Sequence, residues 1–227
     1  MTSVKLQLVF KFTEIILVSA LVKTKSDVQE TENIQQLILN TAADAFAEHG
    51  FSGTSLRDIG ELAGINFQSI RYHFGSKEAL WEKVVEVLSR KGQEAGLHHE
   101  QAIAGLPLKD QLRAQVRAII AYQAANPNLN RILMREAMKN SERYKRIYPL
   151  YVSGFLELSQ KFLGKLQKEG VVKKDIPIKD LVMIFTGALN YRLIAQATSE
   201  YYTKKSVDSD AAIEQHAAAL TNLLLAK

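Results

Sequence analysis

The stretch Thr54–Lys77, T-S-L-R-D-I-G-E-L-A-G-I-N-F-Q-S-I-R-Y-H-F-G-S-K, predicts a helix, a tight turn and a second helix. Ser55 and Asp58 have the spacing of a capping box, because the hydroxyl can accept from free amides of the first turn and the carboxylate suits the positive helix end. Gly64 can adopt a positive φ, so the chain is expected to reverse there. The first helix has one apolar stripe at helical spacing: Leu56, Ile59, Ala63 and, beside them, Leu62.

The second helix carries mostly polar side chains. Asn66 suits its N-cap, and at about 100° per residue Ile70 and Phe74 share the inward face. The other side chains are Gln68, Ser69 and Tyr72 on the opposite face, Arg71 at the flank and Phe67 near the edge of the buried stripe. In a DNA major groove, Gln can pair with adenine and Arg with guanine, so these residue types fit base reading. Lys77, just beyond the helix, can reach a phosphate.

Four motifs in and after this stretch resemble those of a known family: T-S-x-x-x-I, A-G-I, Y-H-F and S-K-E-A-L. They are similar to the DNA-binding domain of TetR-type (TetR/AcrR) transcriptional regulators, over about residues 33–88. In that family a homodimeric repressor leaves operator DNA when a small molecule binds its C-terminal domain. The resemblance therefore implies double-stranded DNA and a small-molecule effector as partners. Carried over position by position, it places DNA contacts at Ser55, Phe67, Gln68, Ser69, Arg71, Tyr72, His73 and Lys77.

Three positions depart from the family pattern. The family usually has Tyr where this chain has Arg71, Ala where it has Gly60, and often Gly or Pro where it has Gln68. The first and third departures change groups that would face DNA, so the operator cannot be taken from a relative.

The composition favours an all-α fold. Of the 227 residues, 47% are hydrophobic and 23% charged, which is ordinary for a globular protein, and only four are proline. Abundant Ala, Leu, Gln, Glu and Lys favour helix throughout. The absence of cysteine excludes a disulfide framework, thiolate catalysis and thiol redox sensing.

The net charge of +5 does not by itself indicate nucleic-acid binding. Residues 31–80 contain three Lys and Arg against six Asp and Glu, a net charge of −3. Between Ile65 and Lys77, however, there are two cations and no anion. Phosphate attraction depends on charges close to the backbone, so modest non-specific affinity is expected. The excess of cations in residues 110–174 is interpreted as a solvated helix surface.

Residues 1–30 are treated as an N-terminal extension, which is interpreted as poorly ordered or as a mis-assigned start. Its apolar clusters are interrupted by Lys11 and Glu14 and are too short to span a bilayer. Two alternatives remain: a secretory signal with a cleavage site at Val18-Ser19-Ala20, and an arm that binds a membrane or a partner.

The remaining chain divides into residues 31–78, a helix-turn-helix DNA-binding domain, and residues 79–227, a helical effector-binding and dimerisation domain. Asn33–His49 is a clean amphipathic helix; Gly50 can end it in the left-handed conformation, with Phe51 folding back onto its last turn. Glu78–Lys91 continues as a helix, and Gly92–Pro107 is expected to be a loop or broken helix. His98 and His99 are interpreted as exposed residues and not as metal ligands.

The C-terminal region supplies the predicted dimer interface and effector pocket. Ile178–Ser199 is apolar nearly all round and, with Ala211–Leu225, is expected to form a four-helix interface with a second copy, as in the family. Tyr201–Ser209 is the expected connecting loop. Five residues are candidates for a mixed apolar and polar pocket: Tyr148, Tyr151, Phe155, Asn190 and Arg192.

Three functions remain in view. The first is a cytoplasmic, ligand-responsive repressor that needs no cofactor or metal. The second, an enzyme, lacks a Gly-rich phosphate loop, a metal-ligand set and a nucleophile with its base. The third is a helical adaptor or membrane-tethered interaction protein without sequence-specific DNA binding.

Overall fold

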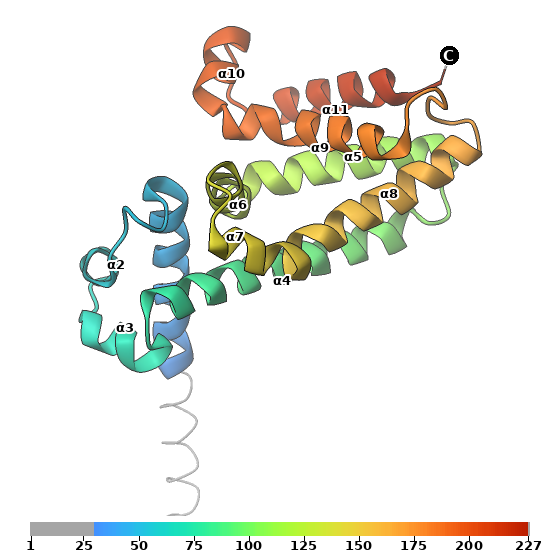
Figure 1. Cartoon of the computed structure of the whole chain (residues 1–227). Helices are drawn as coiled ribbons and strands as arrows, with labels where there is room; N and C mark the ends of the chain where they lie inside the picture. Colours follow the sequence, from blue (N-terminus) through green and yellow to red (C-terminus); the bar gives the residue numbers. More distant parts are fainter. Residues whose placement is uncertain (1–29, 227) are drawn as a thin grey trace, which may run out of the picture.

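The computed structural model describes residues 30–226, in which a small helical unit and a larger helical layer share one long helix (Figure 1). The predictions for residues 1–29 lie outside the described residues. Within them, the all-α prediction is confirmed; an isolated β-bridge joins Val172 to Leu225. No helix in this part of the chain is long and apolar enough to cross a membrane.

The small unit, residues 30–76, contains the first helix (residues 30–49), α2 (Leu56–Ala63) and α3 (Phe67–Phe74). We call it the three-helix unit. Its centre is formed by fully or almost fully buried side chains: Ile38, Ala42, Phe46, Ile59 and Ile70. The apolar stripe on α2 was predicted too wide, because Leu62 is 67% exposed. Leu37, on the first helix, is likewise 46% exposed.

The long helix is α4 (Lys77–Ile103), which starts at the N-cap of Ser76, whose Oγ accepts from the amide of Ala79 at 3.1 Å. The predicted loop at Gly92–Pro107 is therefore wrong, since only residues 104–107 separate α4 from α5 (Leu108–Ala125). A glycine costs a helix about 1 kcal/mol, which packing can offset. A Cβ at Gly92 would lie 3.6 Å from the Tyr122 ring of α5, so the two helices approach closely there.

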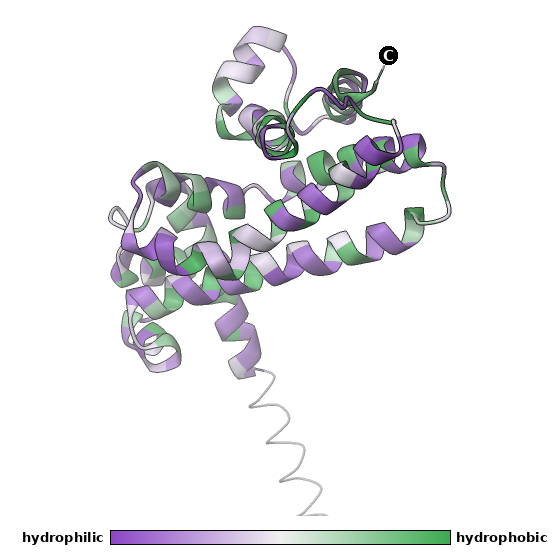
Figure 2. Cartoon of the chain, turned by 45° about the vertical axis from the view of Figure 1, so that its right-hand side comes forward, coloured by the Kyte–Doolittle hydropathy of each residue, from purple (hydrophilic) through white to green (hydrophobic). Residues whose placement is uncertain are grey.

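The larger layer is built from the helices after α4 (Figure 1). They are α5, α6 (Asn128–Met138), α7 (Glu142–Ile147), the π-helical turn η1 (Tyr148–Val152), α8 (Ser153–Lys168), α9 (Ile178–Ile194), α10 (Gln196–Thr203) and α11 (Asp210–Leu224). Hydrophobic and hydrophilic residues alternate along α4 and α8, as expected for helices with one face inward (Figure 2). Side chains from α5, α8, α9 and α11 form one buried cluster.

The helices contribute to two buried clusters, and neither cluster consists only of helices that are consecutive in the sequence. The first cluster joins the three-helix unit to the start of α4 and also contains Ile132 of α6 and Ile147 of α7. The second cluster contains residues of α5, α8, α9 and α11. Helices α6 and α7 therefore pack on the three-helix unit although they follow it by some 50 residues in the sequence.

The α9 segment is shorter than predicted. The helix ends at Ile194, because Ala195 leaves helical geometry with φ −99° and ψ 46°. Residues 196–203, part of them predicted as loop, form α10 instead. The face of α9 that points away from the second cluster is exposed and apolar, with Met183, Ile184, Tyr191 and Ile194 all at least 41% exposed.

The continuous α4 predicts the effect of replacing one of its glycines. A Cβ at Gly96 would meet nothing within 4 Å, so Gly96→Ala should raise the free energy of unfolding by about 0.5–1 kcal/mol. Gly64→Ala is the matched control, because a φ of +66° there strains any side chain and the variant should be less stable. Urea unfolding measures both. A lower stability of Gly96→Ala would mean that α4 is interrupted at this point.

Candidate nucleic-acid interface

Helix α2 begins with the capping box that the sequence predicts. The Ser55 Oγ accepts from the Asp58 amide at 3.1 Å, and the Ser55 amide donates to Asp58 Oδ2 at 2.7 Å. The backbone and then the hydroxyl of Ser55 lower the pKa of the Asp58 carboxyl below its ordinary value. At the other end, Gly64 has φ +66° and its amide donates to the Glu61 carbonyl at 3.3 Å. Both ends of α2 are therefore fixed by local hydrogen bonds.

Gly60 lets α2 approach the start of α3 more closely than any other residue type would. A Cβ at this position would lie 2.7 Å from the carbonyl oxygen of Ile65 and 3.3 Å from the amide nitrogen of Phe67. Real Cβ atoms do not approach backbone that closely, so an alanine here would push the turn or α3 away. Glycine at position 60, where the family usually has alanine, therefore allows a tight turn between α2 and α3.

Helix α3 shows the predicted inward and outward faces except at Ser69, which was expected on the outward face. Asn66 caps its start, with Oδ1 accepting from the Gln68 amide at 2.9 Å. Ile70 is fully buried, whereas Phe74 and Ser69 are half-buried. Three potential base-reading side chains are exposed: Gln68, Arg71 and Tyr72, the last at 85%. The surface of α3 therefore offers an amide, a guanidinium and a phenol side by side, while their contact with DNA stays a prediction.

Arg57 was not among the predicted DNA contacts, but the structure places it against α3. Its guanidinium carbon lies 5.3 Å from the centroid of the Phe67 ring, and the side chain is exposed. A cation over an aromatic face is attracted by the ring and kept in place. This pair joins α2 to α3 across the turn, so Arg57 extends the cationic edge of the interface. The pairing depends on how the turn folds and has no signal in sequence spacing.

Two predicted contacts are turned toward the protein. Nδ1 of His73 lies 3.5 Å from Nε2 of Gln35 on the first helix. Lys77 Nζ donates to the carbonyls of Phe51 at 3.0 Å and Thr54 at 2.9 Å, and it lies 4.2 Å from the centroid of the Phe51 ring. Lys77 is therefore not the free side chain that the sequence suggested, and a phosphate could bind only through its remaining N–H. Both contacts with DNA stay predictions.

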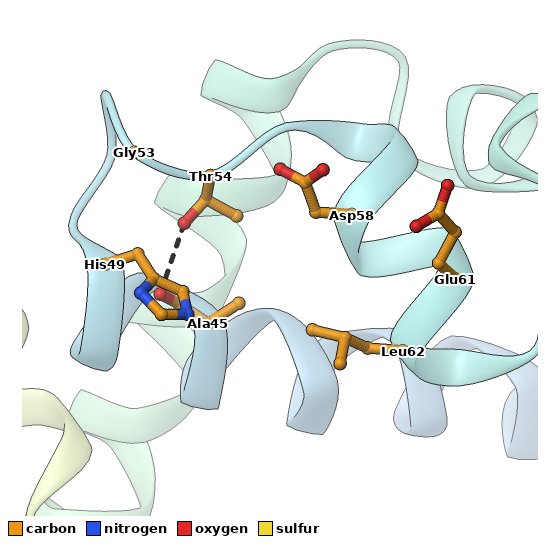
Figure 3. Close-up of a pocket in the computed structure, with 7 residues that line it drawn as sticks. All are labelled: Ala45, His49, Gly53, Thr54, Asp58, Glu61 and Leu62. Atoms are coloured by element: carbon orange, nitrogen blue, oxygen red, sulfur yellow. Dashed lines mark hydrogen bonds between the residues drawn. The ribbon is translucent and has the colours of Figure 1, made fainter.

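An open hollow lies between the end of the first helix and α2, and Thr54 is among the residues that line it (Figure 3). Thr54 is buried, and its Oγ1 donates to the carbonyl oxygens of Ala45 at 3.2 Å and Gly50 at 2.9 Å. The side chains of Asp58 and Glu61 project from α2 along the same side (Figure 3). Two carboxylates repel phosphate, so this surface is unsuited to DNA.

The five residues predicted for an effector pocket fall into two groups. Tyr151 packs on the first buried cluster, and the Tyr148 ring lies tilted against that of Tyr144 with ring centroids 5.9 Å apart, while Phe155 is 36% exposed. Asn190 and Arg192 lie on α9 and bond to backbone, Asn190 to the Thr186 carbonyl at 2.7 Å and Arg192 to the Ala212 carbonyl at 3.1 Å. The described contacts do not bring the two groups together, and the pocket stays a prediction.

Comparison with known families decides what kind of protein carries this interface. Residues 38–84 match the family model described as "Bacterial regulatory proteins, tetR family", and residues 109–223, half of the chain, match "Tetracyclin repressor-like, C-terminal domain". The chain belongs to the TetR family. The predicted resemblance and the predicted helix-turn-helix fold class are thereby confirmed.

Individual TetR-family relatives are distant. The probable HTH-type transcriptional regulator YttP of Bacillus subtilis (strain 168) is 30% identical over 115 residues, which are 51% of this chain and 56% of YttP. The probable acrEF/envCD operon repressor of Escherichia coli (strain K12) is 26% identical over 178 residues, 74% of this chain and 76% of the repressor. The chain thus matches little more than half the length of YttP.

Solved structures of other proteins share the fold. HlyIIR, a hemolysin II transcriptional regulator, superposes with a TM-score of 0.68 at 20% identity, covering 87% of this chain and 99% of HlyIIR. AibR, solved with isovaleryl coenzyme A and operator DNA, gives a TM-score of 0.67 at 18% identity, with coverage of 85% and 98%. At such identities the likeness concerns the fold.

The tight turn at Gly60 predicts a specific loss of stability. Gly60→Ala should lower the free energy of unfolding by about 1–3 kcal/mol, because the new methyl group must displace backbone on the α3 side. Thermal and urea unfolding measure the loss, with Gly154→Ala as a control whose Cβ would meet nothing within 4 Å. A Gly60→Ala variant as stable as the wild-type chain would show that the close approach of α2 and α3 is not required.

Proposed function

We propose that this TetR-family protein is a homodimeric transcriptional repressor that binds a palindromic operator through α3 and leaves it when a small molecule binds. The observation that carries the proposal is the exposed amide, guanidinium and phenol of Gln68, Arg71 and Tyr72 on a helix anchored by buried Ile70. Side chains of these types can form hydrogen bonds with base edges in the major groove. Arg57, Ser55 and the α3 N-terminus supply groups for the phosphates on either side.

A second copy of the chain is the proposed occupant of the exposed apolar face of α9 and α11. The face is formed by Met183, Ile184, Gly187, Tyr191 and Ile194 of α9 with Ala218, Ala219 and Leu223 of α11. Apolar faces of this kind are usually covered in soluble proteins, and a twofold axis lets one face cover its own copy. Two-fold symmetry would also place two α3 helices on successive major grooves of one duplex.

An effector can release the DNA only by binding one arrangement of the dimer more tightly than the other. AibR was solved with isovaleryl coenzyme A, and two relatives carry the name KstR2, one of them described as a ketosteroid transcriptional regulator. For this chain we propose an unidentified small molecule, bound among the helices after α4, in a cytoplasmic regulator without cofactor or metal. The adaptor interpretation is less favoured, since it gives no reason for an exposed reading face on α3.

Selection from a random duplex library, followed by sequencing, tests the proposed function directly. The wild-type chain should enrich sites with two inverted half-sites. Gln68→Ala and Tyr72→Ala should each weaken binding to the selected duplex by about 10- to 100-fold at fixed salt, because each removes a base-facing group. Binding to unrelated duplex should change little. Fluorescence anisotropy with the selected duplex measures both affinities.

The controls are Gln93→Ala on α4 and Tyr202→Ala on α10, which remove the same side chains from exposed positions away from α3. Both should bind like the wild-type chain. Unchanged affinity in Gln68→Ala and Tyr72→Ala, or enrichment of no site at all, would contradict the proposal.

A further inference from the structure

Two side chains of α6 and α7, Arg135 and Arg143, contact the three-helix unit, and a third, Glu136, is paired with Arg143. We call them the α6–α7 clasp. We propose that the clasp fixes the angle at which the three-helix unit is held, and thereby sets the half-site spacing that the dimer accepts. The part concerning spacing rests on the proposed function; the part concerning the angle does not.

Arg143 is stacked on the three-helix unit. Its guanidinium carbon lies 3.8 Å from the centroid of the Phe51 ring and 5.9 Å from that of Trp81 on α4. A guanidinium lies flat on an aromatic ring and is attracted by the ring electrons. Lys77 lies on the same ring at 4.2 Å, so Phe51 contacts cations from both α4 and α7. Any displacement of α7 relative to Phe51 would break this stack.

Glu136 fixes the orientation of the Arg143 side chain. Its Oε2 lies 3.1 Å from both Nε and Nη2 of Arg143 and accepts from the Ser141 hydroxyl at 2.5 Å. The Glu136 side chain is only 2% exposed. A buried ion pair adds little net stability compared with apolar side chains, because desolvation offsets the attraction. What it supplies is a single geometry, and here that geometry aims Arg143 at Phe51.

Arg135 provides the second attachment. Its Nε donates to the Ala47 carbonyl at 3.1 Å and its Nη2 to the Glu48 carbonyl at 2.7 Å. These carbonyls belong to the last turn of the first helix, where acceptors lack intrahelical partners and the helix dipole is negative. Nδ2 of Asn128, one end of α6, also donates to Asp44 Oδ1 at 2.7 Å. Helix α6 is thus bonded along the end of the first helix at three points.

The clasp is connected to the proposed dimer interface by continuous structure. Helix α7 passes through the π-helical turn η1 into α8, and α8 packs against α9. π-helical turns are rare and often occur at functional positions. A shift of α8 can therefore reach Phe51 through η1 and Arg143. Since two α3 helices must match successive grooves, a change in this angle changes the half-site spacing.

The test compares a neutralised clasp with the wild-type chain. Glu136→Gln together with Arg143→Gln removes the ion pair without leaving one buried charge alone, so the variant should fold, as helical circular dichroism would check. The chain has no cysteine, so Glu61→Cys on α2 and Lys161→Cys on α8, both exposed, can carry a pair of spin labels. Dilution with unlabelled chain restricts the measured distances to one protomer. In the chain with the wild-type clasp, the distances between the two spin labels should be narrowly distributed. In the variant with the neutralised clasp, this distribution should be shifted or clearly broadened.

The matched control neutralises another ion pair, with Arg117→Gln and Glu214→Gln, which lies exposed between α5 and α11. Its label distances should equal those of the wild-type chain. Unchanged distances in the clasp variant as well would overturn the proposal, since a purely stabilising pair would not move the label.

Half-site spacing gives the second readout. On duplexes in which the selected spacing is changed by single base pairs, the wild-type chain should lose about tenfold or more in affinity per change, and the clasp variant should lose about threefold or less. Equal discrimination by both would overturn the role in spacing. If the wild-type chain selects no duplex, the proposed function fails, while the label distances still decide whether the clasp holds the three-helix unit.

Discussion

The packing of the Phe51 ring is the contact on which the arrangement of the helices depends. Gly50, with φ +73°, turns the chain so that the ring folds back onto the first helix, where it stacks on Phe46 with centroids 6.1 Å apart. The Trp81 ring forms a T-shaped pair with it, with centroids 6.2 Å apart, and Lys77 and Arg143 lie over the Phe51 ring. The Phe51 side chain thus joins the first helix, α4 and α7. The position of α3 depends on how these three helices are arranged around it.

The reading helix itself contributes little to its own position. Helix α3 has eight residues and only Ile70 is fully buried, whereas isolated helices of that length are not stable in water. Its position is imposed by the Asn66 cap, by the close approach at Gly60 and by the Arg57–Phe67 stack. Supporting contacts outside α3 leave its outward side chains free for a partner. This separation of support from recognition explains how the departures from the family pattern at Gln68 and Arg71 can coexist with the family fold.

Local chemistry predicted much of the fold. The Ser55 capping box, the left-handed Gly64, the Asn66 cap and buried Ile70 depend on short-range geometry, and all are observed. The loop predicted at Gly92 failed because helix propensity is a weak preference that packing against Tyr122 overrides. The positions of Lys77, Arg57 and Arg143 depend on the aromatic rings of Phe51 and Phe67, which lie from 10 to 92 positions away in the sequence. Helical periodicity gives no information about contacts between residues so far apart. The outward face of α3 could therefore be predicted from the sequence, whereas these contacts between different elements could not.

Two copies of α3 on one duplex are what the proposed repressor requires. Native mass spectrometry of the full chain with the duplex obtained by selection counts the chains in each complex without any assumption about their arrangement. The expected result is a dimer in the absence of DNA and a complex of two chains with one duplex. A single chain bound to the duplex, or a free chain that remains monomeric at micromolar concentration, would contradict the twofold reading of the operator.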